Sequence, residues 1–488
     1  MRKRRFRIPP HIDQQITPEV REYIVQLAEG YEKKIRELEK RIEELEARFA
    51  KLTPQNSSLP PSVQHPHAKP KPAAKKSDGP RKKQGAQPGH RGNFRELVPL
   101  ERCDHVEDRH PTSCRKCQRP LVGSDPEPLR HQVIELPEIH PRVSEYRLHR
   151  LTCKCGTQTC ASLPAGVTPK QFGPRLAAFC GLLLGHFRQS RRRAAAFLSN
   201  LLNVPCSTGW TIKIQNAVSD ALEESYEELR QQLPQQPQLF VDESPTKEQN
   251  KKAWLWVAVA SEFTVFGVFP DRTRCSLQQL LGNYAGTIIN CDRAKMYLDA
   301  DRLQWCWAHL KRDLQQLIDH RDGQAQRLGR DLMREYRKLF ERWHRYKQGE
   351  ISWKIFQDDV EPIRHQFSSY LLRGKFAVNP AMSGMCEELL KHVDWLWTFT
   401  EVEGLEPTNN AAERALRPAV IHRKLSFGTQ SRAGSRFLER MLTVVETCRQ
   451  QSRSPFEFLT QAIEASFHNT KPPSLLIPST PNTLRKVA

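Results

Sequence analysis

Three acidic residues stand where a fold can bring carboxylates together on metal ions. Asp242 ends the apolar run QLFVD, Asp292 ends TIINCD, and Glu413 lies within PTNNAAERALRP. Carboxylate oxygens are hard ligands that suit Mg²⁺ or Mn²⁺, and two such ions about 4 Å apart can activate an attacking hydroxyl and stabilise a leaving oxygen. If the three carboxylates converge, the sequence predicts a two-metal site that cuts and joins nucleic acid without a covalent protein intermediate.

The charge of the chain favours a polyanionic partner. Its 488 residues carry 76 Lys and Arg against 55 Asp and Glu, a formal net charge of +21. Basic side chains displace condensed counterions from phosphate backbones, so DNA or RNA is the first candidate partner. An anionic membrane surface is the competing interpretation, but no segment approaches the roughly 20 apolar residues of a spanning helix. We expect no membrane partner.

The cysteines and the start of the chain indicate its compartment. Thirteen cysteines, an odd number scattered over a large chain, favour reduced thiols over a disulfide framework. The basic start MRKRRFRIPP is followed by polar PEVREY where a signal peptide would have an apolar stretch. We therefore expect a cytoplasmic, nucleoid-associated protein.

Several structural units must position the three acids, because 488 residues exceed one ordinary domain. We expect a multidomain α+β protein. Its expected parts are a basic tail and coiled-coil helix (1–52), a disordered, basic, Pro-rich linker (53–92), a zinc-ribbon-like module (93–165), a helical, helix-turn-helix-like DNA-binding region (166–232), an α/β catalytic domain (233–455) and a C-terminal tail (456–488).

A sustained heptad pattern marks the first part. Apolar residues recur at alternating steps of four and three, with Glu, Lys and Arg at the positions between. Such a seam predicts a coiled coil that joins protomers into a homo-oligomer. One amphipathic helix packed on its own chain is the alternative, but the linker that follows offers nothing to cover the seam. The seam residues are Ile24, Ala28, Tyr31, Ile35, Leu38, Ile42, Leu45, Phe49 and Leu52.

Two cysteine pairs predict a structural Zn²⁺ site. Cys114 and Cys117 form a CxxC, Cys153 and Cys155 form a CxC, and the sequence Val133 to Leu151 between them alternates weakly like a β-ribbon. Four thiolates close a tetrahedral shell and leave no position open for substrate, so this zinc would be structural. Since the CxC is tighter than the usual knuckle, one ligand position stays open. The alternative ligands are Cys160, His149 and Cys103.

Residues 166–232 have the pattern of helices separated by short turns. A helix after RRR, the turn VPCSTGW and a following helix resemble a helix-turn-helix reader of DNA. Many helical hairpins share this pattern, so DNA reading and plain packing both stay open. The basic triplet favours phosphate contact. It consists of Arg191, Arg192 and Arg193.

The catalytic segment begins with β-rich runs. QLFVDES, AWLWVAVA and TVFGVF are divided by short polar turns and predict a three-stranded antiparallel meander, and GTIINCD predicts a later strand. In an RNase H-like fold the first strand is central and the later strand pairs beside it in parallel. That arrangement would place Asp242 and Asp292 on neighbouring strands.

Glu413 lies one turn inside a predicted helix. Thr408, Asn409 or Asn410 can cap that helix, which we expect to lie against the sheet and present the third carboxylate. The stretch between the second aspartate and this glutamate is too long for one connection, so we expect a helical insertion from about 318 to 400 whose tryptophans pack in a core. The basic residues expected to contact phosphates here are Arg414, Arg417, Arg423 and Lys424.

The order of these blocks resembles the transposases of the insertion sequence 66 family, members of the DDE superfamily. The resemblance covers nearly the whole chain and is most specific in NNAAERALRP, RKLSFGTQSRAGSR and CWAHLKRDL. It implies an RNase H-like catalytic domain in which Asp242, Asp292 and Glu413 are the metal-binding DDE residues. It also makes Cys306 and His309 a CxxH downstream of the second aspartate, for which a structural role and direct contact with DNA stay open.

The resemblance further implies a DNA transposase. Such an enzyme binds the terminal inverted repeats of its element, cleaves DNA with two Mg²⁺ or Mn²⁺ ions, and transfers the cut strand to target DNA; accessory transposition proteins are candidate further partners. A domesticated DNA-binding regulator that keeps the fold without catalysis is the second hypothesis, although all three carboxylates survive here. A structure-specific nuclease, which shares the metal site but joins no strands, is the third.

Overall fold

The computed structural model describes three stretches of the chain: residues 16–50, 96–377 and 380–477. The expected linker, 53–92, lies outside the described residues, as does Leu52 of the heptad seam. Among the residues described, no helix has both the length and the apolar character that a membrane span requires.

Contacts between Cα atoms divide the chain into two units, residues 66–142, and residues 1–65 with 143–488. The described part of the first unit has little regular structure: a 3₁₀ helix, η2 (Leu100–Arg102), and an isolated bridge between Ser113 and Pro120. The side chain of Gln132 binds both backbone groups of Val98, accepting from its N–H at 2.9 Å and donating to its carbonyl at 2.7 Å.

The β-ribbon predicted for Val133–Leu151 is wrong in position. The paired strands are β1 (Arg150–Thr152) and β2 (Gln158–Cys160), which run antiparallel. The side chains of Val133 and Leu136 are 81% and 80% exposed. Alternation that buries no apolar face gains nothing from strand pairing, so the stretch before β1 stays irregular.

The predicted N-terminal helix is α2 (Pro18–Ala50). Three residues of its heptad seam, Tyr31, Ile35 and Leu38, are exposed. The helix is therefore confirmed, while its pairing with a second copy stays a prediction.

Five strands form one mixed sheet: β3 (Gln238–Glu248), β4 (Lys251–Val259), β5 (Thr264–Phe269), β6 (Ile288–Cys291) and β7 (Arg302–Trp305). Their order is β5-β4-β3-β6-β7. The first three strands are antiparallel, as predicted, and β6 and β7 run parallel to β3. The first strand in sequence is thus the centre of the sheet. The shorter elements around it are α7 (Arg274–Leu281) and the 3₁₀ helices η3 (Leu233–Gln235) and η4 (Lys295–Tyr297).

Both faces of this sheet are covered, which explains the continuous apolar run in β4. Leu255 and Val257 pack against Ala412, Ala415 and other residues of α13 (Asn410–Ser426). The alternate residue Trp256 belongs to the larger core on the opposite face. A strand buried on both sides carries apolar side chains at every position rather than at every second one.

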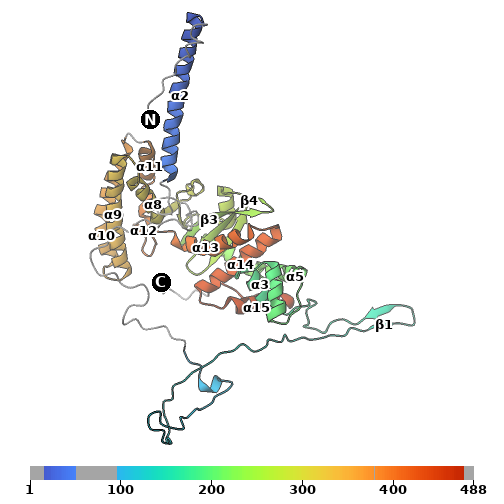
Figure 1. Ribbon diagram of the computed structural model, residues 1–488. Coiled ribbons are helices and arrows are strands. Elements are labelled where there is room, and N and C mark those ends of the chain that lie inside the picture. The colour runs from blue at the N-terminus through green and yellow to red at the C-terminus, as the bar shows by residue number, and fades with distance from the viewer. Residues whose placement is uncertain (1–15, 51–95, 378–379, 478–488) are drawn as a thin grey trace. The chain divides into compact units, whose positions relative to one another are not determined.

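Helices that precede the sheet in the sequence and helices that follow it pack together on the larger core. The helices α3 and α5 contact α14 and α15 (Figure 1). The segment predicted as a C-terminal tail, 456–488, thus contributes a packed helix, and the 166–232 region shares one hydrophobic core with the sheet. The bounds of these helices are α3 (Pro174–Gly185), α4 (Arg191–Leu201), α5 (Thr208–Ala221), α6 (Glu223–Gln232), α14 (Arg432–Gln450) and α15 (Pro455–Phe467).

The free edge of β5 is closed by side chains of α14. The backbone N–H of Thr264 donates to Thr447 Oγ1 at 3.1 Å and that of Phe266 to Thr443 Oγ1 at 3.0 Å. The next outward N–H, that of Val268, donates to the carboxylate of Glu439. Acceptors spaced four residues apart on a helix thus match donors two residues apart on an edge strand, which satisfies groups that otherwise invite strand addition.

The segment predicted as a helical insertion, 318–400, is helical in the structure. It follows α8 (Trp307–Ile318), and the long helices α9 and α10 lie side by side (Figure 1). Trp343 and Trp397 are buried, which confirms that they belong to a core. The bounds are α9 (Gly323–Lys347), α10 (Trp353–Lys375), α11 (Pro380–Lys391) and α12 (Asp394–Glu401).

The end of α13 is tied to the end of β3. Phe427 is left-handed at φ +58° and Gly428 has φ +105°, which turns the chain back toward the strand. The backbone N–H of Thr429 then donates to the carbonyl of Lys247 at 2.9 Å, and the N–H of Gln249 donates to the carbonyl of Thr429 at 2.8 Å. These bonds fix the helix that carries Glu413 against the central strand.

Replacing Gly428 with Ala is expected to lower the free energy of unfolding by about 1–3 kcal/mol. The new Cβ would lie 2.4 Å from the Lys247 carbonyl oxygen, in a backbone conformation that L side chains rarely adopt. Chemical denaturation measures the change. The control is Gly384→Ala on α11, where no atom within 4 Å meets the added methyl; equal stability of the two variants would contradict this account.

Candidate active site

The parallel pairing of β3 with β6 brings two of the predicted acids to one end of the sheet. Phe240 lies opposite Asn290 in the strand register, and Asp242 and Asp292 each follow two residues later. Each carboxylate is oriented by a nearby backbone N–H: Asp242 accepts from Glu243 at 2.9 Å, and Asp292 accepts from Ala294 at 2.8 Å. Asp242 thus lies within β3 and Asp292 directly follows the neighbouring strand β6, each with its carboxylate held by a backbone N–H.

Asn409 brings the third acid to the same place. It is the N-cap residue of α13, but its side chain caps nothing; Nδ2 instead donates to the carbonyl of Val241 on β3 at 2.7 Å. Of the three candidate caps, Thr408, Asn409 and Asn410, it is Asn409 that occupies the N-cap position, but it makes no side-chain cap hydrogen bond. Its own carbonyl accepts from the N–H of Glu413 at 3.2 Å. The first turn of α13 is thus fastened beside Asp242.

The carboxylates are close enough to repel one another. Burial raises the pKa of Asp242 well above its ordinary value, and the charges of Glu243, Asp292 and Glu413 raise it further. The hydrogen bond from the Glu243 N–H opposes this increase. The three acids named from the sequence therefore share one electrostatic environment.

Glu243 is a fourth acid that the sequence analysis missed. Its side chain is 2% exposed and binds Arg272 Nε at 2.5 Å and the hydroxyl of Tyr297 at 2.5 Å. Burial, followed by the charge of Asp292, raises its pKa. Arg272 also lies 3.4 Å from Asp292, so one guanidinium serves two of the acids. The sequence VDES shows the extra acid, but strand alternation assigns it to the opposite face from Asp242.

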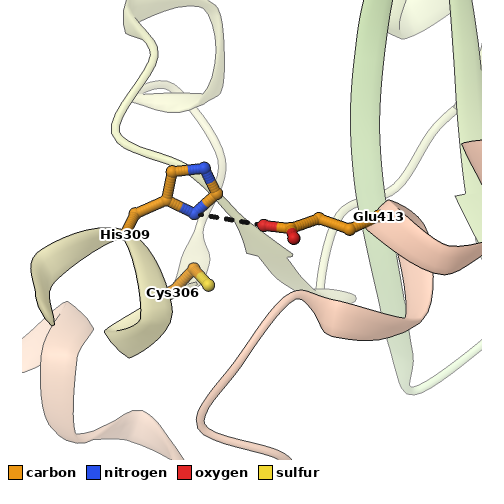
Figure 2. A group of neighbouring side chains, drawn as sticks. All are labelled: Cys306, His309 and Glu413. Atoms are coloured by element: carbon orange, nitrogen blue, oxygen red, sulfur yellow. Dashed lines mark ion pairs between the residues drawn. The ribbon is translucent and has the colours of Figure 1, made fainter. Parts of the chain in front are cut away.

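The start of α8 faces Glu413 from the other side. Cys306 is the N-cap residue of α8, and His309 lies on its first turn. His309 Nδ1 is 3.7 Å from Glu413 Oε1, and Arg312 Nη2 is 3.7 Å from the same oxygen. The dashed line in Figure 2 marks the pair of His309 and Glu413. Burial and the charge of Arg312 lower the pKa of His309 to about 4, so its imidazole is neutral. Burial raises the pKa of the Cys306 thiol.

Most of the predicted DNA-contacting residues are exposed. Arg191, Arg192 and Arg193 occupy the first turn of α4, and Arg414, Arg417 and Lys424 lie on the exposed side of α13. Arg423 is half-buried instead.

Arg423 also binds within the protein. Its guanidinium donates to Ser244 Oγ at 3.1 Å and to the carbonyl of Pro245. Arg188, just before α4, lies near enough to His422 on α13 to lower the pKa of that imidazole, after the larger effect of burial. The two basic segments are therefore neighbours.

The four predicted zinc ligands are divided between the two units. Cys114 and Cys117 lie in residues 66–142, whereas Cys153 and Cys155 lie in the turn between β1 and β2. Hydrogen bonds from the backbone at Cys117 lower the pKa of Cys114, and hydrogen bonding with Thr157 lowers that of Cys155 to about 7. One cysteine of each pair is thus set in a turn that lowers its pKa, and the zinc site stays a prediction.

Without divalent cations, Asp242→Asn is expected to stabilise the protein by about 0.5–2 kcal/mol at neutral pH. A carboxyl whose pKa is raised on folding contributes full stability below its unfolded pKa and loses it as pH rises through its folded pKa. The amide has no such loss, so its advantage should grow with pH.

Chemical denaturation in a chelator, repeated from pH 4 to 8, measures the difference. Asp220→Asn, at an exposed position near the end of α5, is the matched control and should show no growing advantage. An Asp242→Asn protein less stable than the parent at pH 8 would show that the carboxylates do not repel as the geometry requires.

Comparison with known proteins places the chain in a family. The transposase IS66 family model matches residues 170–436, and a family of unknown function (DUF6444) matches residues 7–96. The chain is also 24% identical over 263 residues to the uncharacterized protein y4qI of Sinorhizobium fredii (strain NBRC 101917 / NGR234). That alignment covers 46% of this chain, which spans about half (47%) of the relative's length. Because the IS66 match covers more than half of the residues, the protein belongs to the IS66 family of transposases.

Proposed function

We propose that this transposase cleaves and joins DNA strands with two Mg²⁺ or Mn²⁺ ions held by Asp242, Asp292 and Glu413. The observation that carries the proposal is the geometry: the parallel register of β3 and β6 sets Asp242 beside Asp292, and Asn409 fastens the first turn of α13, with Glu413, to β3. The raised pKa of Asp242, caused by burial and by the charges of the neighbouring acids, agrees with it. Carboxylates that repel one another in a protein without bound cations form a site that divalent cations stabilise. The strand order β5-β4-β3-β6-β7, with the first strand central, supports an RNase H-like catalytic domain.

The donor set fits hard divalent cations. Glu413 Oε1 is buried without a hydrogen-bond partner among the described residues, and Arg312 approaches it only to 3.7 Å. Arg272 pairs with both Asp292 and Glu243, and among the described residues Asp242 forms no ion pair. When bound, the ions would activate the attacking hydroxyl and stabilise the leaving oxygen of the phosphodiester.

The chain's own residues would orient the reacting groups. The aspartates are fixed by strand pairing and backbone hydrogen bonds, and Glu413 is fixed by the anchored first turn of α13. Arg272 and Tyr297 both bind the Glu243 carboxylate, and Arg272 also pairs with Asp292. The exposed Arg414, which directly follows Glu413, and Arg417, one turn beyond it, would bind phosphates on either side of the cut.

Helices α4 and α5 supply the proposed contact with element ends. One face of α5 packs against α3, α14 and α15, and its other face exposes Lys213 and Asn216. Arg191 to Arg193, on the first turn of α4, would bind backbone phosphates while α5 enters a groove. The sequence left DNA reading and packing open; the packed helix with an exposed polar face is compatible with both at once.

A homo-oligomer through α2 completes the proposal, since two element ends must be held together for joining. The exposed seam residues Tyr31, Ile35 and Leu38 would then be buried against a second copy. Substituting Ile35 with Glu should shift the full chain to monomer, as measured by light scattering at micromolar concentration. Lys33→Glu, at an outward heptad position, is the matched control; loss of the oligomer in both variants, or in neither, would reject the seam.

Asp242→Asn is expected to leave binding of terminal inverted repeats within about threefold of the parent and to lower Mg²⁺-dependent nicking by at least about 1,000-fold, since removing one ligand disables the shared ions. Gel shift and nicking of a labelled end measure the two. Asp358→Asn, at an exposed position on α10, is the control for charge. Normal nicking by the Asp242 variant would refute the assignment.

Joining separates a transposase from a structure-specific nuclease. Given pre-nicked ends and a target duplex, the parent protein should yield strand-transfer product in Mg²⁺, and the Asp292→Asn and Glu413→Gln variants should yield none. Nicking without any joined product would favour the nuclease.

A further inference from the structure

A second group of metal-ligating atoms lies beside the acids and is not used by the proposed reaction. The thiol of Cys306, the imidazole of His309 and the carboxylate of Glu413 have ligand atoms within 4.8 Å of one another, and Figure 2 shows their side chains converging from α8 and α13. In the described part of the chain, these three side chains are the group of His, Cys, Asp or Glu whose ligand atoms lie close enough to share one metal ion.

The spacing suits one small cation better than a hydrogen bond. His309 Nδ1 and Glu413 Oε1 are 3.7 Å apart, beyond hydrogen-bond distance, and both atoms are buried with no hydrogen-bond partner among the residues described. Two ligands on one tetrahedral Zn²⁺, each about 2.1 Å from the ion, stand about 3.4 Å apart. A buried polar atom without a partner is costly, and a shared cation would satisfy both.

The ligand types distinguish this group from the aspartates. Thiolate and imidazole are ligands of Zn²⁺ and Co²⁺, whereas Mg²⁺ prefers oxygen alone. The backbone N–H of Asn409 donates to Cys306 Sγ at 3.1 Å, an outer contact of the kind that orients metal-bound sulfur. Zn²⁺ would bind Cys306 as the thiolate, and the charge of the cation would offset that thiolate and the Glu413 carboxylate, which lies beside Arg312.

We propose that Cys306, His309 and Glu413 form a site for a thiophilic divalent cation, Zn²⁺. This site is separate from the proposed two-metal site at Asp242 and Asp292. Three protein ligands leave a fourth position for water. Glu413 belongs to both sites, so Zn²⁺ at α8 withdraws that carboxylate from the Mg²⁺ site and inhibits cleavage. The inhibition rests on the proposed function; the binding of zinc does not.

Zinc content of the full-length protein tests the site. After equilibration with buffered Zn²⁺ and desalting, the parent should hold one equivalent more than Cys306→Ser, His309→Ala and Glu413→Gln. Zinc on the paired cysteines of residues 114–155, where present, is the same in all of them and cancels in the difference. Cys448→Ser, at another buried thiol, is the matched control and should keep the equivalent.

Cobalt substitution identifies the ligand. Co²⁺ bound to the parent should show thiolate-to-metal charge-transfer absorption that falls by one thiolate in Cys306→Ser and is unchanged in Cys448→Ser. Removing any one ligand should weaken binding by at least about tenfold, the loss seen even when outer partners are removed. If circular dichroism shows that Cys306→Ser does not fold, metal binding by His309→Ala provides the test instead. Equal zinc content in the parent and the folded ligand variants overturns the site.

The functional consequence is measured separately. Zn²⁺ added at fixed Mg²⁺ should reduce nicking by the parent, and Cys306→Ser should require at least about tenfold more Zn²⁺ for the same fractional loss of its own zinc-free rate. A parent that holds the extra equivalent but never nicks DNA would refute the proposed function and leave the zinc site standing. A parent that nicks DNA but lacks the extra equivalent of zinc would refute the zinc site and leave the proposed function standing.

Discussion

The contacts of Asn409 hold the candidate site together. This residue is 1% exposed, and it joins three elements that are far apart in sequence. Its side chain donates to Val241 on β3, its N–H donates to Cys306 at the start of α8, and its carbonyl accepts from Glu413 on α13. The neighbouring segment is fixed in the same way, because Glu406 accepts from Asn290 on β6. One buried amide therefore sets the position of the third carboxylate relative to the other two.

That anchoring works against electrostatic repulsion. Four acids, Asp242, Glu243, Asp292 and Glu413, lie close enough to act on one another, and Arg272 and Arg312 form ion pairs with three of them. The energy that holds them comes from packing away from the site: β4 is buried on both faces, and α14 closes the edge of β5. A fold can carry a strained cluster of charges when the surrounding core over-determines its geometry.

The sequence predicted more of the fold than of the contacts. Apolar runs ending in Asp identified β3 and β6, because strand alternation and length are local properties. Helix α2 and the helices of the insertion were also predicted, because apolar periodicity is local too. Glu243 and Arg272 were missed, since their proximity depends on where β5 ends. The choice of Asn409 among the three candidate caps, and its bond to β3, could not be predicted because its partner, Val241, is 168 residues away. The prediction of a β-ribbon before β1 was wrong, because weak alternation does not specify strand pairing when nothing packs against the apolar side chains.

The helical insertion is joined to the site rather than appended to it. The carbonyl of Leu396 on α12 accepts from Trp307 Nε1 at 2.7 Å and from the side chain of Gln304 on β7 at 3.2 Å. Gln304 in turn accepts from the N–H of Phe399 at 2.7 Å, so α12 satisfies side chains of the edge strand β7. Trp307 immediately follows Cys306. These hydrogen bonds link the position of α12 to the start of α8, where Cys306 and His309 face Glu413. We therefore expect a displacement of the insertion to shift the surroundings of the third carboxylate.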